Sequence, residues 1–362
     1  MVVAAFFGIG VGRAINHTRT ITTAAAPAGS SLPTGGLPDN GGTGAAGPLS
    51  GAAVTAVERG VVDINTKLGY QSATAAGTGM ILTSTGEILT NNHVIDGATA
   101  ISATVVATGR TYTAKVVGTD VTADVAVLQL QGASGLSPIP LGNSSTVATG
   151  DTVIALGNAG GVGGAPSVVS GTVQATGQAI TASDQGGANA ERLTDLLETD
   201  APIQPGDSGG PLVDAGGKVI GMDTAASTGS RFQVAANTAF AIPINDALSI
   251  VHQIEAGKAS ATIHLGLPGF LGVEVQGADA LGGNATPGAV ISAVVAGSPA
   301  ARAGLQAGDV ITAVDGHKIA AASDLTTQLR GHQPNDRVSL TWTDQSGASH
   351  TATVTLMTGP AN

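Results

Sequence analysis

A serine flanked by glycines lies in residues 206–211, which read GDSGGP. A serine hydroxyl is a weak nucleophile unless a base takes its proton and N–H donors await the oxyanion. Flanking glycines let the backbone turn tightly, so that the N–H groups of Gly206 and Ser208 can point into one pocket. We therefore predict Ser208 as a nucleophile, with Gly206, Asp207 and Ser208 forming its oxyanion loop. The alternative is an ordinary turn in a chain with 54 glycines.

A base for this serine is predicted at His93, directly after the strand-like run 87–90. The end of a strand is a rigid platform for a base. A lone histidine is more often structural, but His93 is the one histidine in the β-rich part of the first domain. The other histidines lie in the leader, in a predicted helix or beyond that domain: His17, His252, His264, His317, His332 and His350.

The third group of such a site must orient the imidazole and stabilise its charge. Asp124 precedes the apolar run 125–130, a position that can bury its carboxylate near the core. Asp120 and Asp151 are competitors, with turn residues as their ordinary role. The chain order His, Asp, Ser is that of the chymotrypsin group and differs from that of subtilisins and α/β-hydrolases. The prediction is a catalytic triad of His93, Asp124 and Ser208.

These residues need a scaffold, and the composition favours strands. Aromatic residues make up 2% of the chain and charged residues 11%, so the core must come from Val, Ile, Leu and Ala. Abundant Val, Thr and Gly fit strands and turns better than helices. Even spacing of short strands predicts a barrel or sandwich. The predicted strands are 57–65, 78–82, 87–90, 111–117, 126–130, 152–156, 168–175, 211–213 and 218–222.

A run with helical periodicity, residues 244–256, closes this first domain at about residue 258. Asn245 or Asp246 can cap the helix, and Gly257 can end it. A second domain is predicted at residues 262–357, a size that suits one small core. Its predicted strands are 272–275, 289–295, 309–314, 338–343 and 351–356, and its predicted helices are 299–303 and 323–330.

The N-terminal region differs from both domains. Residues 1–12 are uncharged and largely apolar, but a membrane-spanning helix needs roughly 20 apolar residues. We interpret residues 1–23 as the distal half of a membrane anchor or as a short signal-like segment; a buried N-terminal element is a third possibility. Residues 24–52 are rich in Gly, Pro and Ala. They cannot bury enough apolar surface to offset their ordering entropy, and are predicted as a flexible linker.

Charge and cysteine content exclude several functions. The formal net charge is −11, which argues against a nucleic-acid partner, because phosphate binding needs clustered Lys and Arg. The chain has no cysteine, and therefore no disulfide, no thiolate metal ligand and no cysteine nucleophile. No metal and no cofactor are predicted.

Three segments of the first domain, residues 90–95 (TNNHVI), 124–130 (DVAVLQL) and 199–212 (TDAPIQPGDSGGPL), resemble the HtrA family of serine proteases. The second domain resembles a PDZ module in residues 269–273 (GFLGV) and 297–311 (GSPAARAGLQAGDVI). The resemblance covers residues 53–357. It implies a mainly β protein, with a chymotrypsin-like double β-barrel protease domain at 53–258 followed by one PDZ domain.

The resemblance also implies a function. It implies a serine endopeptidase that forms an acyl-enzyme and cleaves misfolded or regulatory envelope proteins, anchored in or exported across the membrane, with its catalytic domain outside the cytoplasm. The family commonly forms trimers, whose interfaces often use aromatic residues, and this chain has few. Many relatives carry Asn where this chain has Asp207. A chaperone or binding protein with latent proteolysis is the alternative function.

The PDZ resemblance implies capture of a peptide C-terminus, with its carboxylate in a nest of backbone N–H groups. The predicted peptide-binding residues are Phe270, Leu271, Gly272 and Val273. Leu325 and Leu329, at i and i+4 of a helix, can line the pocket for the last side chain; ordinary core packing is their alternative role.

The residues before the nucleophile predict its specificity. Pro202 occupies the position six residues before Ser208, where trypsin-like enzymes carry the charge that selects Lys or Arg. Its neighbours Ala201 and Ile203 are apolar, and Asp200 is interpreted as structural. We predict a small, apolar primary pocket.

Overall fold

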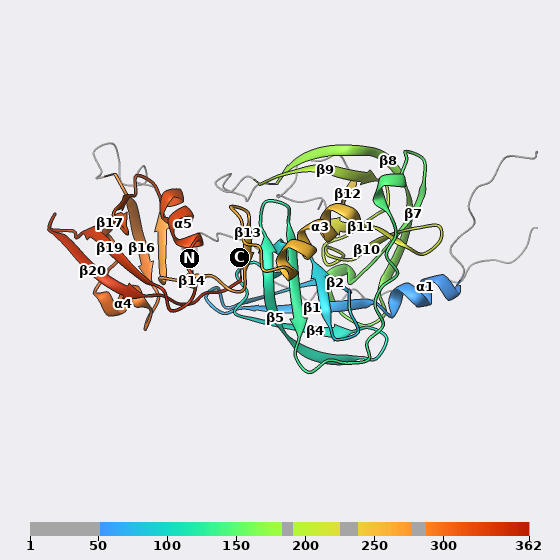
Figure 1. The fold of residues 1–362 in the computed structure, drawn as a ribbon, viewed down its shortest axis with the longest axis horizontal. Helices are drawn as coiled ribbons and strands as arrows, with labels where there is room; N and C mark the ends of the chain where they lie inside the picture. The colour runs from blue at the N-terminus through green and yellow to red at the C-terminus, as the bar shows by residue number, and fades with distance from the viewer. Residues whose placement is uncertain (1–50, 183–190, 225–237, 277–286, 362) are drawn as a thin grey trace, which may run out of the picture.

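The computed structural model describes residues 51–182, 191–224, 238–276 and 287–361. The predicted N-terminal segment and nearly all of the predicted linker lie outside the described residues. Among the helices that are described, none has the length and apolar character needed to cross a membrane. Figure 1 shows the larger, N-terminal domain built from two sheets, with the smaller C-terminal domain beside it.

The first barrel of the larger domain has six antiparallel strands in the order β5-β4-β1-β2-β3-β6, and pairing of β5 with β6 closes it. Its strands alternate buried and exposed positions only in part, because residues on both faces of β6 are covered. The strands are β1 (Val61–Leu68), β2 (Ala73–Ile81), β3 (Glu87–Thr90), β4 (Ala100–Val105), β5 (Arg110–Asp120) and β6 (Val125–Leu130).

The second barrel is closed in the order β10-β11-β12-β9-β8-β7. Strands β4, β9 and β12 were not among the sequence predictions. β9 contains Glu, Arg and leucines, which favour helices, but its pairing with β8 and β12 makes it a strand. The strands are β7 (Thr152–Gly157), β8 (Ser167–Ala182), β9 (Glu191–Thr199), β10 (Pro211–Asp214), β11 (Val219–Thr224) and β12 (Ala239–Pro243).

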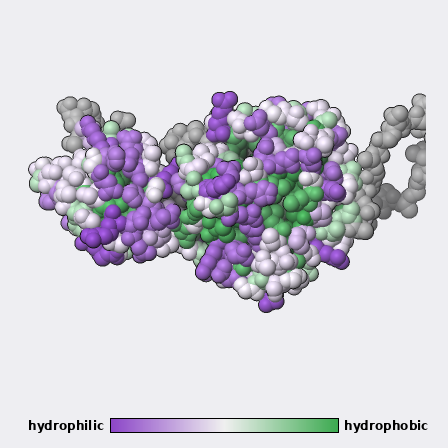
Figure 2. Space-filling view, viewed as in Figure 1, coloured by the Kyte–Doolittle hydropathy of each residue, from purple (hydrophilic) through white to green (hydrophobic). Residues whose placement is uncertain are grey.

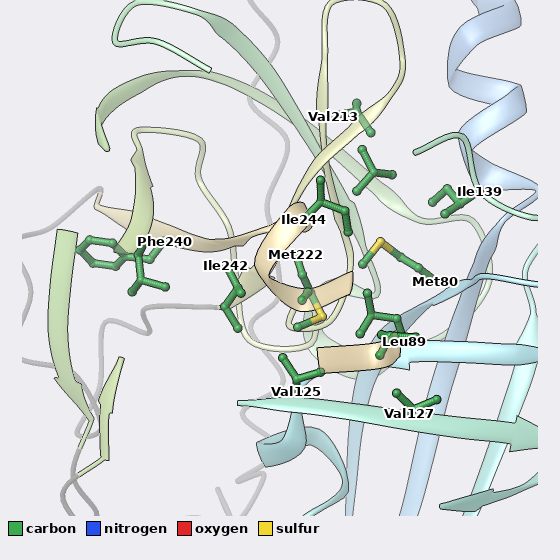
Figure 3. Packing of buried hydrophobic residues seen from close by; sticks show 14 of the residues in the cluster. Met80, Leu89, Val125, Val127, Ile139, Val213, Met222, Phe240, Ile242 and Ile244 are labelled. Carbon is green, nitrogen blue, oxygen red and sulfur yellow. The ribbon is translucent and has the colours of Figure 1, made fainter. Parts of the chain in front are cut away.

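A shared hydrophobic cluster joins the two barrels. Met80, Leu89 and Val127 from the first barrel and Met222 and Phe240 from the second belong to one buried cluster. In Figure 3, Met80, Leu89 and Met222 lie close together beside the first turn of α3, with Val127 below them and Phe240 farther to the left. Burying each large apolar side chain contributes roughly 1.5–3 kcal/mol. This cluster therefore fixes how the ends of the two barrels face each other.

The helices of the larger domain are few and short: α1 (Gly51–Glu58), α2 (Asn92–Ile95) and α3 (Ile244–Glu255), with 3-10 turns η1 (Ser144–Thr146) and η2 (Ala159–Gly161). The predicted strand 57–65 is corrected at its start, because Val57 lies in α1 and β1 begins at Val61. α3 begins after Pro243, with no side-chain cap. Asn245 and Asp246 therefore lie inside its first turn, and their prediction as caps is wrong.

The smaller domain has a sheet in the order β15-β16-β17-β19-β20, with β18 beside β17, and a separate two-stranded ladder of β14 and β21. Its helices α4 (Pro299–Ala303) and α5 (Ala322–Arg330) match the predicted runs closely. The strands are β14 (Gly269–Phe270), β15 (Val273–Gln276), β16 (Ala289–Val294), β17 (Val310–Val314), β18 (His317–Lys318), β19 (Arg337–Thr343), β20 (Ser349–Thr355) and β21 (Met357–Thr358).

A short strand lies next to the predicted domain boundary at residue 262. β13 (Ile263–Leu265) pairs antiparallel with β5, so it extends the sheet of the first barrel. The strands of the smaller domain follow it in the chain, from β14 onward. On the face drawn in Figure 2, apolar residues gather over the larger domain between strips of polar ones.

One carboxyl of the first barrel has an unusual titration. Burial raises the pKa of Glu87, in β3, to about 7, and a hydrogen bond with Glu255 and its negative charge add to the shift. The ordinary pKa is 4.5, so the folded chain binds this proton more tightly than the unfolded chain. The resulting contribution to stability is complete below about pH 4.5 and is lost as the pH rises through about 7.

We expect Glu87→Gln to remove this loss of stability at higher pH, because glutamine keeps the hydrogen bond to Glu255 without titrating. The free energy of unfolding of the variant, relative to that of the unsubstituted chain, should rise between about pH 5 and about pH 8. Urea denaturation at several pH values measures it. Glu274→Gln, the same substitution at an exposed position of β15, is the matched control. A flat difference for Glu87→Gln would contradict the prediction.

Candidate active site

The ends of strands from both barrels meet where the predicted triad lies. His93 is in α2, directly after β3, and Asp124 immediately precedes β6; both belong to the first barrel. Ser208 precedes β10 of the second barrel and is 6% exposed. The Thr78 N–H of β2 donates to the Ser208 carbonyl at 2.8 Å, which holds the serine backbone against the first barrel.

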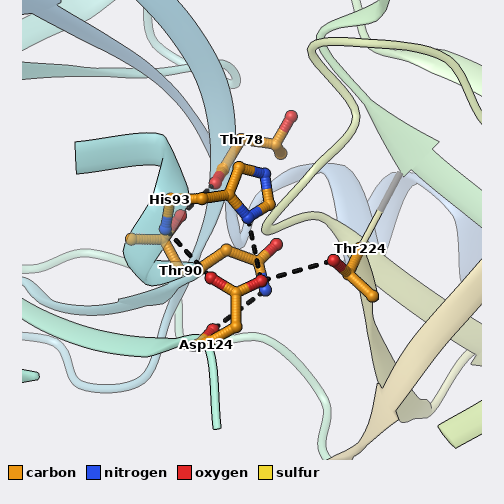
Figure 4. A network of polar contacts seen from close by, with 6 residues as sticks. Thr78, Thr90, His93, Asp124 and Thr224 are labelled. Atoms are coloured by element: carbon orange, nitrogen blue, oxygen red, sulfur yellow. Dashed lines mark hydrogen bonds and ion pairs between the residues drawn. The ribbon is translucent and has the colours of Figure 1, made fainter. Parts of the chain in front are cut away.

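The carboxylate of Asp124 contacts residue 93 with both oxygens. Its Oδ2 lies 2.8 Å from His93 Nδ1, and its Oδ1 accepts from the His93 backbone N–H at 2.9 Å. Thr224 Oγ1 of β11 donates to Oδ2 at 3.3 Å. Figure 4 shows Asp124 between His93 and Thr224. With Nδ1 facing the carboxylate, Nε2 is the ring nitrogen left to exchange a proton with a hydroxyl.

Asp124 has a left-handed backbone, with φ of 55°. Such a conformation costs about 1–3 kcal/mol for a residue with a side chain, and it persists only where the surroundings impose it. Here the Asp124 carbonyl accepts from Asn92 N–H at 3.2 Å and from Asn91 Nδ2 at 3.1 Å. These bonds hold the carbonyl toward α2, so that the side chain can reach His93.

Both competing aspartates accept from backbone N–H groups of their own turns, and Asp120 also bonds to a residue distant in the chain. Asp120 Oδ1 accepts from Thr122 and Ala123 N–H, and its Oδ2 accepts from Thr262. Asp151 Oδ2 accepts from Ala148 N–H at 2.8 Å. Both act as turn residues, which was the alternative role given to them.

The predicted oxyanion loop needs one correction. The Asp207 N–H donates to the Gln204 carbonyl at 3.0 Å, so it closes a turn and is not directed at an oxyanion. Gly206 has φ of 101°, and a Cβ there would lie 2.2 Å from the Asn158 carbonyl oxygen. Only glycine meets both conditions, so this position is closed to side chains.

Thr78 is a residue of the site that the sequence reasoning did not single out. Its hydroxyl donates to the Gly206 carbonyl at 2.7 Å and accepts from Asn158 N–H at 2.9 Å. Its carbonyl accepts from Thr90 Oγ1 at 2.7 Å. One fully buried threonine of the first barrel thus contacts both sides of the nucleophile loop, and nothing in its local sequence marks it.

The turn that begins at Asn158 packs against the same loop and was also missed. Gly160 N–H donates to the Pro205 carbonyl at 2.8 Å, and Gly163 N–H donates to Asn158 Oδ1 at 2.7 Å. Asp63 Oδ2 of β1 accepts from Gly164 N–H at 3.1 Å. Burial raises the pKa of Asp63, partly opposed by that bond. An aspartate that follows two valines and precedes an isoleucine in β1 was the one signal in the sequence.

Two further carboxyls are buried at the nucleophile loop: that of Asp207 within the loop and that of Asp223 in β11. Asp207 is 1% exposed and accepts from Ser167 Oγ and Gln204 N–H, both at 2.9 Å; burial raises its pKa. Asp223 is fully buried, and its backbone bonds to Gly209 and Gly210, each at 2.8 Å. Burial, and then the charge of Asp207, raise the pKa of Asp223 well above its ordinary value.

Asp200 also has structural contacts. Its carboxylate accepts from Thr172 N–H at 2.6 Å and from Gln174 Nε2 at 3.0 Å. Ala201 and Ile203 belong to a buried apolar cluster. Among the described residues, no group of three or more His, Cys, Asp or Glu side chains is arranged to hold a metal ion.

In the smaller domain, the predicted nest lies between β14 and β15. Gly272 has φ of 83°, and a Cβ there would lie 2.2 Å from Ser298 Cβ. Within the described part of the chain, the N–H groups of Leu271 and Gly272 have no hydrogen-bond acceptor. Leu325 and Leu329 are 0% and 1% exposed and belong to the same buried cluster as Leu271, which favours their alternative role in core packing.

Comparisons with known proteins agree with this architecture. A family model described as a trypsin-like peptidase domain matches residues 77–222, and one described as a PDZ domain matches residues 269–356. "Serine protease PepD" of Mycobacterium tuberculosis is 38% identical over 310 residues, which cover 82% of this chain and 63% of that protein.

"Periplasmic serine endoprotease DegP" of Escherichia coli is 37% identical over 265 residues, 72% of this chain and 52% of that protein. A solved structure described as "HtrA-type protease AlgW with tripeptide" is 34% identical, covers 86% of this chain and 97% of that one, and gives a TM-score of 0.49. The chain spans 52% to 63% of the length of these two curated relatives. From the two family models and these identities, the chain belongs to the HtrA family of trypsin-like serine proteases with a C-terminal PDZ domain.

Proposed function

We propose that this chain is a serine endopeptidase in which His93, Asp124 and Ser208 act as one catalytic unit. The observation that carries the proposal is the 2.8 Å contact between His93 Nδ1 and Asp124 Oδ2 beside the glycine-flanked serine. A carboxylate at Nδ1 selects the tautomer whose Nε2 accepts the serine proton, and it stabilises the imidazolium that forms.

The proposed reaction has two stages. Ser208 Oγ attacks the scissile carbonyl while His93 Nε2 takes its proton, and the N–H groups of Gly206 and Ser208 stabilise the oxyanion. His93 then protonates the leaving amine, which departs and leaves an acyl-enzyme. Water, activated by the same imidazole, hydrolyses the ester and restores the serine. The fixed position of Gly206 against Asn158 supports this role for its N–H.

The proposed substrates are misfolded or regulatory proteins of the cell envelope. The support is the family and the location outside the cytoplasm that "periplasmic" in the relatives' names indicates for those proteins. An N-terminal anchor or signal-like segment and a homotrimer stay proposals from the sequence. The domain limits we propose are 53–265 for the protease and about 269–357 for the PDZ domain, which follows the pairing of β13.

Replacing Ser208 by Ala should lower casein hydrolysis by about 10⁴–10⁶-fold, because the imidazole has no other nucleophile to activate. His93→Ala should lose about as much, and the double variant no more than either, since residues that act together are not additive. Thermal melting should show each variant folded. Casein cleavage by Ser208→Ala at the unsubstituted rate would contradict the assignment and would favour a chaperone with unrelated protease contamination.

The primary specificity pocket is proposed to be small and apolar. The carboxylate of Asp200 is exposed but is bonded to Thr172 and Gln174, and Asp223 is fully buried, so neither supports a free counter-charge in the pocket. A substrate Lys in an apolar pocket loses its hydration without a compensating partner. Apolar pockets discriminate weakly by size, on the order of 10–200-fold per methylene.

We therefore expect cleavage after Val, Ala, Ile and Leu, and near-exclusion of charged residues before the cut bond. Digestion of a peptide library, read by mass spectrometry, measures this preference, with the Ser208→Ala variant as the blank. Cuts that fall mainly after Lys and Arg would mean that a carboxylate reaches the pocket, and the proposed specificity would be wrong.

The PDZ domain is proposed to bind exposed peptide C-termini. The N–H groups of Leu271 and Gly272, which have no acceptor among the described residues, support a carboxylate-binding nest between β14 and β15. Phe270 and Val273 flank this turn, and both are fully buried. They would therefore shape the nest. Leu325 is also fully buried, so the last side chain of a peptide would contact it only if the domain opened beside α5.

We expect a peptide with a free apolar C-terminus to bind the Ser208→Ala chain at least tenfold more tightly than its amidated form, because the amide removes the charge that the nest holds. Fluorescence anisotropy measures the two affinities. Gly272→Ala, which places a methyl against Ser298, should abolish the difference. Gly297→Ala is the control, since that glycine also has positive φ but open space around it. Equal affinities in the Ser208→Ala chain would refute carboxylate capture.

A further inference from the structure

The segment that follows the last strand of the PDZ domain returns to the protease domain. Ala361 N–H donates to the Ala98 carbonyl at 2.8 Å, and the Ala361 carbonyl accepts from Gly97 N–H at 2.7 Å. Ala361 is 1% exposed and lies in the first-barrel cluster that contains Val94 and Ile95. Figure 1 shows this end of the chain between β14 and the first barrel. Ala361 thus makes two hydrogen bonds with the turn that directly follows α2, the helix that contains His93.

That helix depends on contacts at its two ends. α2 has four residues, and a single helical turn is unstable in water without outside contacts. At its start, Asp124 accepts from Asn92 and His93 N–H. At its end, Asp96 N–H donates to the Asn92 carbonyl, and Ala98 N–H donates to the Ile95 carbonyl at 2.9 Å. The turn to which Ala361 is hydrogen-bonded, residues 96–98, therefore continues α2 and determines where this helix ends.

The contact at Ala361 is continuous with the PDZ fold. Gly359 N–H donates to the Pro268 carbonyl at 2.9 Å, and β21 pairs with β14 immediately before it. A second contact reaches the same region, because the Tyr70 and Phe270 rings lie 5.1 Å apart. The Tyr70 loop is itself tied to the turn, since Gly69 N–H donates to Thr99 Oγ1 at 3.1 Å. These two contacts between the domains therefore both lead to residues 96–99.

We propose that residues 359–361 act as a clasp that positions α2, and through it the His93 imidazole, for proton transfer from Ser208. The clasp makes the PDZ domain a structural part of the catalytic site, with Ala361 as a positioning residue. The inference rests on the proposed protease function. When the clasp opens, Gly97 N–H and the Ala98 carbonyl return to water and the turn gains freedom. A displacement of about 1 Å at a catalytic base can cost about 10²-fold in rate.

The test is Ala361→Asp, which places a charge in the buried cluster and should open the clasp. The substrate is a chromogenic peptide too short to reach the PDZ groove, so that KM reports the protease cleft alone. We expect kcat to fall about tenfold and KM to change less than twofold, because the base moves and the cleft does not. Amide exchange at Gly97, measured by hydrogen–deuterium exchange, should accelerate in parallel. The affinity for a C-terminal peptide should stay unchanged.

Two control variants separate the clasp from general damage. Thr355→Asp adds the same charge at an exposed position of β20 and should behave as the unsubstituted chain. Ala361→Gly removes the methyl but keeps both backbone bonds, so its amide exchange at Gly97 should be slower than that of Ala361→Asp. If Ala361→Asp lowers the melting temperature of the first barrel, a chain ended after Thr358 opens the clasp without burying a charge and should show the same loss of kcat.

Three results would overturn the proposal. The first is rapid exchange at Gly97 in the unsubstituted chain. The second is unchanged Gly97 exchange in Ala361→Asp, and the third is faster exchange with unchanged kcat. The proposed protease function fails separately, if the unsubstituted chain has no peptidase activity that Ser208→Ala removes. Gly97 exchange would still report on the clasp in that case.

Discussion

The arrangement of the site depends on one carboxylate that contacts one residue twice. Asp124 places Oδ1 on the backbone and Oδ2 on the ring of His93, which fixes both the position and the rotation of the imidazole. The left-handed backbone of Asp124 makes this possible, at a cost in strain. β6, which directly follows Asp124, is buried on both faces. Its packing prevents β6 from shifting, so the backbone strain at Asp124 cannot relax in that way.

The nucleophile comes from the other barrel, so its geometry depends on how the two barrels meet. Burial of the shared apolar cluster stabilises the contact between the two barrels, but it does not by itself select one orientation, because the hydrophobic effect is non-directional. Direction comes from Thr78, whose backbone and hydroxyl bond to Ser208, Gly206 and Asn158. Because that threonine is fully buried, each bond it lost would leave a polar group without water, which penalises any other docking of the barrels.

Acidic groups at the nucleophile loop set a further constraint. Asp207 and Asp223 are both buried, and the negative charge of one raises the pKa of the other. Asp207 is satisfied by Ser167 and Gln204, so no cation is needed to hold it. The loop is thus supported by short hydrogen bonds from several strands. The turn after α2 is bonded in the same way to Ala361, which follows the last strand of the PDZ domain.

The sequence alone determined the family and most strands and predicted the candidate catalytic residues, because a glycine-flanked serine, apolar alternation and turn residues are local patterns. β3 and α4 even begin and end where predicted. It did not reveal β9, Thr78 or the return of Ala361 to the first barrel. Each depends on partners distant in the chain: Thr78 and Gly206 are 128 residues apart. The same threonine in another strand would be an ordinary β residue, so only the tertiary structure decided its role, by burying its hydroxyl between two barrels where every polar atom needs a partner.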